Sequence, residues 1–145
     1  MIIPFLDDAL GFNLYRTGLL FRRELAKAIE EFGITPEQWT VMATLWITGK
    51  PLNQSEITQL TMKDKHTVSR IVQRLERDGL IEKKNDPHDA RITIIRPTRK
   101  GASLKEKVPR CVLQHFDKIL SDYSDEEVNA LIASLKRLRK TLRDE

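Results

Sequence analysis

Hydrophobic residues recur at helical spacing along most of the chain. Residues 5–32 carry apolar side chains about one turn apart, which predicts one long amphipathic helix that ends at Gly33. Thr35 and Gln38 form a capping box at the start of a second helix, which Gly49 ends. The first third of the chain is therefore predicted to be a helical pair.

Two shorter helices are predicted next. Asn53 and Glu56 form another N-cap pair, and Ile57 and Leu60 are expected to give the short helix its buried face. After a three-residue turn, Asp64 can cap a further helix that spans 64–78. The inner face of this helix is aliphatic and consists of Val68, Ile71, Val72 and Leu75.

A hairpin and two more helices complete the chain. Residues 80–83 and 92–95 are typical of strands, and the polar loop between them, with Asp86 and Pro87, predicts a tight exposed connection. Thr98 is expected to cap a long helix, and the capping box at Ser124 starts the last one. The fold class is therefore mainly α with a small β-wing, a winged helix-turn-helix with long helices at both ends.

The length and composition of the chain limit the class of protein to which it can belong. The chain has 145 residues, of which 40% are hydrophobic and 32% charged, so it is a globular domain, alone or with dimerising arms. No apolar run approaches the length of a membrane span, and Asp7 and Asp8 interrupt the short apolar opening, so we expect neither a membrane segment nor a secretory signal. The single cysteine fits a reducing compartment, and we expect a cytoplasmic location.

Positive charge is concentrated in the middle of the chain. The segment from Met62 to Gly101 holds 11 Lys and Arg against 6 Asp and Glu, a net charge of +5 in a chain whose total is +4. A local basic field attracts and steers a polyanion, although a solvated basic surface would give the same count.

The outer face of helix 64–78 has the chemistry that reads DNA. Arginine and glutamine match base edges in the major groove, and serine and threonine suit phosphates. The alternative is that any exposed helix face is polar; the order of the elements and the location of the charge favour DNA. The residues expected to bind DNA are Lys65, His66, Thr67, Ser69, Arg70, Gln73 and Arg74 on this helix, with Lys83, Lys84, His88 and Arg91 in the wing.

Two blocks of sequence resemble one known family. The segment from Asp64 to Ile81, DKHTVSRIVQRLERDGLI, and the pair DPHDAR at 86–91 and TRKG at 98–101 are similar to the recognition helix and wing of the MarR family of bacterial and archaeal regulators. The resemblance implies an obligate homodimer on a pseudo-palindromic operator. We expect the protein to act as a repressor, and activation is the alternative. The resemblance also implies that Arg91 reaches the minor groove and that Asp89 holds the wing.

The sequence departs from the family at one place. Arg96 and Pro97 precede Thr98, where the family has an apolar residue followed directly by the threonine. Since Pro97 has no N–H to donate, we expect the second wing strand to end early.

Both ends of the chain carry more apolar surface than one winged module needs. We therefore expect residues 1–33 and 102–145 to form a helical dimerisation region around a DNA-binding region at 34–101, with its helix-turn-helix at 53–79 and its wing at 80–97. The alternative is that both ends fold back on their own module. The residues expected at the dimer contact are Leu6, Leu10, Leu131, Leu135, Leu138 and Leu142.

A sensing site is a further hypothesis. The resemblance suggests a pocket for a small aromatic anion, which Arg16, Trp39, Met42, Trp46 and His115 would line, although Trp and Met at helical spacing are also ordinary core residues. Cys111 lies four residues before His115, an arrangement that suits a redox sensor, whereas the alternative is an inert cysteine.

Other classes of protein have less support. We expect no metal and no cofactor, since a zinc site needs three or four ligands and the other two histidines, His66 and His88, lie in the DNA-reading region. The sequence has no glycine-rich phosphate loop and no nucleophile with its own base, so we do not expect an enzyme. A protein that coats DNA without sequence choice remains an alternative.

Overall fold

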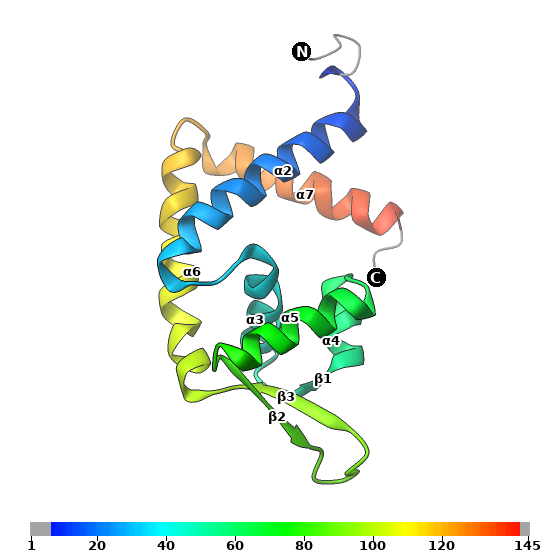
Figure 1. Ribbon diagram of the computed structural model, residues 1–145. Coiled ribbons are helices and arrows are strands. Elements are labelled where there is room, and N and C mark those ends of the chain that lie inside the picture. Colours follow the sequence, from blue (N-terminus) through cyan, green and yellow to red (C-terminus); the bar gives the residue numbers. More distant parts are fainter. Residues whose placement is uncertain (1–6, 143–145) are drawn as a thin grey trace. The chain divides into compact units, whose positions relative to one another are not determined.

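The computed structural model describes residues 7–142, which form helices and one small sheet (Figure 1). The order is α2 (Leu10–Ile29), the short 3-10 helix η1 (Glu30–Phe32), α3 (Pro36–Thr48), β1 (Leu52–Asn53), α4 (Gln54–Thr61), α5 (Lys65–Arg77), β2 (Ile81–Asn85), β3 (Thr93–Pro97), α6 (Arg99–Ile119) and α7 (Asp125–Thr141). The chain divides into two compact units, one up to Val112 and one from Leu113 on.

The predicted N-caps of the helices are confirmed. Capping boxes begin α3 at Thr35, α4 at Asn53 and α7 at Ser124, and the Asp64 carboxylate accepts from the Thr67 N–H at 2.9 Å at the start of α5. The Thr98 hydroxyl accepts from the Gly101 N–H at 3.1 Å and caps α6. Local hydrogen bonding thus sets where each of these helices starts.

The first predicted helix is shorter than expected. Residues 5–32 were expected to form one helix, but α2 begins at Leu10 because Ala9 is extended, and η1 forms its last turn before Gly33, whose φ is 69°. The Asn13 side-chain amide donates to the Ala9 carbonyl at 2.9 Å and to a carbonyl further back, and such side-chain bonds compete with the helical backbone. A tight last turn is common at helix ends.

The sheet has three antiparallel strands in the order β1-β3-β2. The prediction that the second wing strand ends early is wrong, because β3 runs to Pro97, which pairs with Ile81. The Thr98 N–H donates to the Leu80 carbonyl at 3.0 Å and so points toward β2. Because successive N–H groups of a strand point to opposite sides, an N–H at Pro97 would point away from β2. On that side β1 pairs only with Ile94 and Ile95 and does not reach Pro97. Proline is tolerated there because the ladder needs no donor from it.

The hydrophobic core lies in the first unit and draws on each of its major elements. The predicted inner face of α5 is confirmed, since all four of its aliphatic residues are buried. Leu60, in contrast, was expected to be buried and is 56% exposed, because the two-turn helix α4 faces the core along one line that Ile57 occupies. The core residues with no exposed surface are Ile29, Val41, Met42, Ile57, Val68, Val72, Leu75 and Val108.

Candidate nucleic-acid interface

Helix α5 presents a free cationic face. Its side chains at Lys65, His66, Arg70, Gln73 and Arg74 are exposed, as predicted, and none of them makes a hydrogen bond or ion pair with another residue in the range 7–142. The opposite face is anchored in the core, where burial of each aliphatic side chain contributes about 1.5–3 kcal/mol. The helix therefore holds unpaired donors rigidly toward solvent.

Two of the predicted α5 contact residues are less exposed. Thr67 and Ser69 are half-buried, and the Thr67 hydroxyl donates to the Asp64 carboxylate at 2.6 Å. Hydrogen bonds from the side chain and backbone of Thr67 lower the pKa of Asp64, which keeps this N-cap carboxylate charged. Thr67 thus stabilises the start of α5, and its oxygen can still accept a hydrogen bond.

The turn before α5 is tight. Met62 lies at the end of α4 with φ 55°, a left-handed conformation that is uncommon for a residue other than glycine. The Gln54 side-chain amide donates to the Lys65 carbonyl at 3.5 Å and links the start of α4 to the start of α5. Together they fix the angle between the two helices of the helix-turn-helix.

Four contacts hold the other end of α5. The amide of Gln38, which is 1% exposed, donates to the Asp78 carboxylate at 3.2 Å, and the Lys100 ammonium donates to the Asp78 carbonyl at 3.2 Å. The Thr98 hydroxyl donates to the Gly79 carbonyl at 2.6 Å. At Gly101 a Cβ would collide with the backbone of the residue after Gly79, so the first turn of α6 packs directly on the exit of α5. The recognition helix is fixed at both ends.

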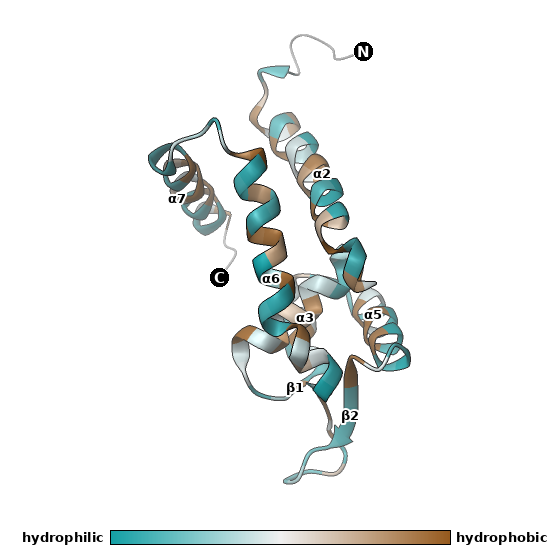
Figure 2. Ribbon diagram, turned by 90° about the vertical axis from the view of Figure 1, so that its left-hand side faces the viewer, coloured by the Kyte–Doolittle hydropathy of each residue, from teal (hydrophilic) through white to brown (hydrophobic). Residues whose placement is uncertain are grey.

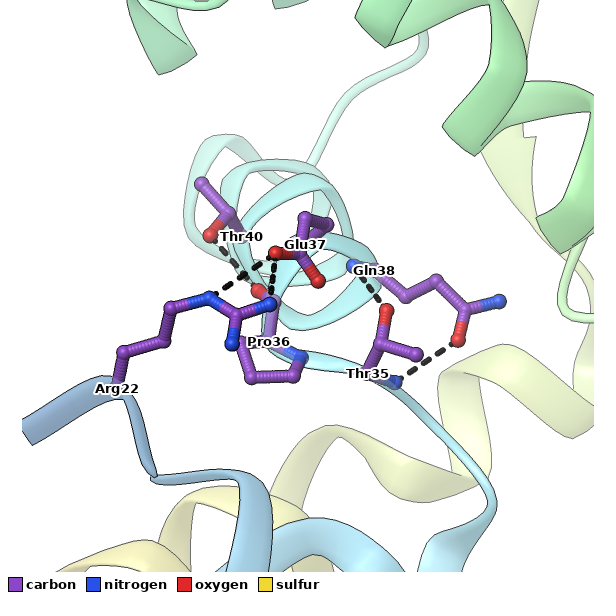
Figure 3. Close-up of polar contacts among 6 residues, drawn as sticks. All are labelled: Arg22, Thr35, Pro36, Glu37, Gln38 and Thr40. Carbon is purple, nitrogen blue, oxygen red and sulfur yellow. Dashed lines mark hydrogen bonds and ion pairs between the residues drawn. The ribbon is translucent and has the colours of Figure 1, made fainter. Parts of the chain in front are cut away.

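Helix α2 is joined to α3 by an ion pair (Figure 3). The Arg22 Nε donates to Glu37 Oε1 at 3.1 Å, and a terminal nitrogen of Arg22 contacts the same oxygen. Burial raises the pKa of Glu37, but the hydrogen bond and charge of Arg22, with the charge of Lys63, outweigh it and leave the pKa below 4.5. The side chain of the next residue, Gln38, bonds to Asp78, the residue that caps the end of α5, so neighbouring residues of α3 contact both α2 and the end of α5. Sequence reasoning missed this ion pair, because Arg22 and Glu37 are separated by 15 positions.

The wing tip is organised by two aspartates. The Asp86 carboxylate accepts from the His88 N–H at 2.7 Å, and the Asp89 carboxylate accepts from the Arg91 N–H at 3.1 Å. Asp89 also receives the Arg91 guanidinium through Nε at 3.1 Å and a terminal nitrogen at 3.2 Å, and these bonds lower the pKa of Asp89. The Arg91 side chain nevertheless stays 91% exposed, so its remaining donors face solvent.

The wing strands carry cations that are partly neutralised. Lys83 lies 3.6 Å from Glu76 of α5, and Lys84 lies 4.0 Å from Glu82. The start of β2 is apolar and buried, whereas its outer part is hydrophilic, which Figure 2 shows as a change from brown to teal along the strand. The unpaired charge of this region is therefore greatest on α5.

The residues predicted to line an effector pocket lie in different places. Met42 and Trp46 are buried, the Trp46 indole donates to the Gly101 carbonyl at 3.1 Å, and the Trp39 ring meets the Trp46 ring edge-on at 6.0 Å. Arg16 is exposed on α2, and His115 belongs to the second unit and is half-buried. The pocket stays a prediction.

The thiol of the single cysteine lies within hydrogen-bond distance of two acceptors, to which its one proton can donate. The Cys111 thiol lies 3.3 Å from the Ala28 carbonyl and 3.2 Å from a Glu31 carboxylate oxygen, both of them acceptors. Such bonds need the thiol proton, whereas a redox sensor reacts as the thiolate. A redox role for Cys111 also stays a prediction.

The residues predicted at a dimer contact are mostly exposed in the single chain. Leu6 lies outside the described residues, Leu10 is exposed on α2, and Leu131 on α7 and Leu142, which caps its end, are 61% and 71% exposed. Leu135 and Leu138 are half-buried. Helix α7, every residue of which is described, contains no buried residue.

Residues 7–142 contain neither a metal-binding cluster nor a membrane-spanning helix. Within this range no three histidine, cysteine, aspartate or glutamate side chains are grouped so that they could hold a metal ion. No helix in the same range is long and apolar enough to cross a membrane.

The chain was then compared with known proteins. The model of the MarR family matches residues 32–92. The helix-turn-helix-type transcriptional regulator PecS of Dickeya dadantii is 30% identical over 132 residues, which cover 90% of this chain and 80% of the relative. A probable transcriptional regulator from Pseudomonas aeruginosa is 31% identical in its crystal structure, with a TM-score of 0.83 over 92% of this chain and 98% of the other.

One similar structure contains DNA. A mutant MarR from E. coli complexed with operator DNA has a TM-score of 0.82 to this chain over 90% of its residues and 94% of the other's, at 21% identity. At that identity the likeness concerns the fold alone.

Proposed function

The chain belongs to the MarR family of DNA-binding transcriptional regulators, and from this premise we propose that it is a repressor that binds a pseudo-palindromic operator as a homodimer. It is a regulator and not an enzyme. The observation that carries the proposal is the face of α5, where exposed arginine, lysine and glutamine side chains have no partner within the described chain. Such a face is complementary to the major groove of a duplex.

The proposed roles follow from the chemistry of each side chain. Arg70 has paired donors that match a guanine edge, and Gln73 can pair with adenine. Lys65 and Arg74 supply charge that neutralises phosphates and makes binding depend on salt. In the wing, Asp89 orients the exposed Arg91 for the minor groove. Lys83, Lys84 and His88 lie near Arg91 in the sequence, and we assign them to contacts with the DNA phosphate backbone.

A dimer would place two such faces on one duplex. The exposed leucines of α7 and of the first half of α2 are the surface that a second copy would bury. Two recognition helices reach successive major grooves when they lie about 34–36 Å apart. The E. coli MarR complex supports DNA binding by this fold, because a protein of similar fold there is bound to operator DNA.

An effector would act by shifting the dimer between two forms. A small aromatic anion that binds near Arg16 and Trp39 would release the operator if it preferred the DNA-incompetent form. A coupling of about 1–3 kcal/mol would lower operator affinity by about 5- to 150-fold. The ion pair between Arg22 and Glu37 supports such coupling, because it connects α2 to the module that carries α5.

The experiment that tests the function has two stages. Genome-wide mapping of bound sites identifies an operator, and gel shifts then compare this operator with a scrambled duplex at two salt concentrations. A regulator binds the operator more tightly at both concentrations, and both affinities fall as salt rises. Equal affinity for the two duplexes would indicate a protein that coats DNA and would contradict the proposal. Transcription from the mapped promoter in vitro, with and without the protein, tests repression directly.

A further inference from the structure

The core of the first unit contains one strongly polar side chain. Among residues 7–142, Gln38, in the first turn of α3, is the only buried side chain that carries an amide, a hydroxyl or a charge, and it is 1% exposed. Burying an amide costs free energy unless both of its polar ends find partners. A methionine side chain would fill a similar space without this cost. The presence of glutamine therefore points to its hydrogen bonds and not to its volume.

The Gln38 side chain uses the two ends of its amide for two different elements. Its carbonyl oxygen accepts from the Thr35 N–H at 2.9 Å, as part of the capping box that starts α3 (Figure 3). Its amide nitrogen donates to the carboxylate of Asp78, the C-cap of α5, at 3.2 Å. An ionised glutamate would supply the acceptor but no donor, and a methionine has no donor either. Glutamine thus matches both partners at once.

Helices α3 and α5 have one directional contact with each other. The bond from Gln38 to Asp78 is the only hydrogen bond or ion pair among residues 7–142 that joins α3 to α5 or to its C-cap. The two helices otherwise meet through apolar side chains of the core. Hydrophobic contact is non-directional, whereas a hydrogen bond requires a defined distance and angle. The tilt of α5 against α3 is therefore set most sharply by Gln38.

The two ends of α5 have different tasks. Lys65 and Arg70, which are proposed to contact DNA, lie in its first half, whereas the bond from Gln38 holds its other end. The helix is about 18 Å long, because each residue adds about 1.5 Å. A tilt of about 5° at the end near Asp78 would move the first turn by about 1.5 Å. Since the lengths of good hydrogen bonds vary by only about 0.5 Å, such a shift would break a contact to a base edge.

We propose that Gln38 is a positioning residue for operator recognition, whose bond to Asp78 sets the tilt of α5 and thereby the preference for operator over other DNA. Gln38 is buried and does not itself reach DNA. A buried polar group of this kind selects one arrangement among those that apolar packing alone would allow. The inference rests on the proposed function, since it requires that α5 reads the operator. It adds a determinant of specificity that lies outside the residues that contact DNA.

The test compares two substitutions at Asp78. Asp78→Asn and Asp78→Ala both remove the negative charge and the ion pair with Arg77, but only alanine removes the oxygen that accepts from Gln38. Fluorescence anisotropy with operator and scrambled duplexes measures the operator preference. It should be near wild type in Asp78→Asn and at least about fivefold lower in Asp78→Ala, the smallest change expected when one bidentate base contact is lost. Affinity for the scrambled duplex should be the same in both variants, because they carry the same charge.

A second pair of variants reverses the direction of the bond. Gln38→Glu keeps the acceptor for Thr35 but places a second carboxylate against Asp78, so it should lower the operator preference. In the double variant Gln38→Glu, Asp78→Asn the asparagine amide can donate to the glutamate, and most of the preference should return. A folded double variant that recovers nothing relative to Gln38→Glu would overturn the proposal.

Folding is measured separately from recognition. Urea denaturation shows where every variant is folded, and the duplexes are compared under those conditions. A purely structural role would lower the free energy of unfolding in Asp78→Ala and leave its operator preference equal to that of Asp78→Asn, which would contradict the inference. Residual dipolar couplings of the α5 N–H groups, measured without DNA, should show a changed helix direction in Asp78→Ala, and an unchanged direction would overturn this inference alone. A wild type that binds both duplexes equally would instead contradict the proposed function on which it rests.

Discussion

Helices α5 and α7 are both amphipathic, and each leaves much of one face uncovered by other residues in the range 7–142. In α5 the apolar face is buried and the free face is cationic. In α7 the polar side faces solvent as expected, but the apolar stripe is only partly covered, and the helix contains no buried residue. Figure 2 shows both brown and teal along α7. The apolar face of α5 is fully packed, and its cationic face is free to bind a polyanion. The apolar face of α7 is not fully packed.

The chemistry of the uncovered face indicates which partner each helix binds. Exposed cations on a well-anchored helix cost little in water, so α5 can remain free until DNA arrives. An apolar stripe gains free energy only when it leaves water, at roughly 25 cal/mol per Å² of buried area. The stripe of α7 therefore predicts a permanent protein partner, and α5 predicts a reversible one.

The largest effect is expected when a buried leucine of α5 is replaced by alanine. Leu75 is fully buried, so Leu75→Ala removes core packing and leaves a cavity, and it should lower the free energy of unfolding by about 3 kcal/mol. Urea denaturation at two protein concentrations measures this loss. The loss should be the same at both concentrations, because the contacts of Leu75 lie within one chain. A loss below about 1 kcal/mol would contradict the burial of this face.

The same substitution on α7 should act on assembly. Leu131→Ala should weaken the proposed dimer by about 2 kcal/mol, which is roughly 30-fold in the dissociation constant. Analytical ultracentrifugation over a range of concentrations measures it, and Lys136→Ala, an exposed polar position of α7, is the control. A wild-type protein that stays monomeric, or a Leu131→Ala dimer of unchanged affinity, would show that α7 is not the contact.

The sequence predicted the helices well because their start signals are local. Thr35, Asn53 and Asp64 each bond to a backbone N–H three residues on, and this needs no knowledge of the rest of the chain. The cationic face of α5 was likewise readable, since burial of Val68 and its neighbours leaves the other side exposed.

Features that depend on distant residues were missed or misjudged. Strand β1 has two residues and exists only because it pairs with β3, more than 40 positions away. The bond from Gln38 to Asp78 spans 40 positions and leaves no periodic signal. Leu60 follows the helical spacing of a buried face, but its exposure depends on how much of α4 the neighbouring helices cover. Tertiary packing, which no local pattern contains, decided all three.

A substitution on the DNA-reading face of α5 should have a smaller effect than the two leucine substitutions. Arg70→Ala should weaken operator binding by about 1–2 kcal/mol and reduce the preference for operator over scrambled DNA, because a bidentate contact to guanine would be lost. Fluorescence anisotropy with both duplexes measures this change. Lys136→Ala removes the same charge from α7 and should leave both affinities unchanged. Equal losses on both duplexes would make Arg70 a phosphate contact.

The smallest effect is expected at the ion pair that joins α2 to the module carrying α5. Since the pKa of Glu37 is lowered in the folded state, its contribution to stability is present above the ordinary carboxyl pKa of 4.5. This contribution is lost as the pH falls through the lowered value, because the protonated carboxyl no longer pairs with Arg22. Partly exposed pairs of this kind contribute at most about 1 kcal/mol.

Glu37→Gln should therefore be less stable than the wild type at neutral pH, and the difference should close under acid conditions. Urea denaturation of both proteins, repeated from neutral pH down to about one unit below the ordinary carboxyl pKa, measures the difference. Glu106→Gln changes an exposed carboxylate of α6 that has no ion pair with another described residue, and it should match the wild type throughout. A difference between Glu37→Gln and the wild type that stays constant with pH would mean that Glu37 acts through packing and not through its charge. If Glu37→Gln binds the operator more weakly at neutral pH although its free energy of unfolding is unchanged, the pair helps α2 to set the position of α5.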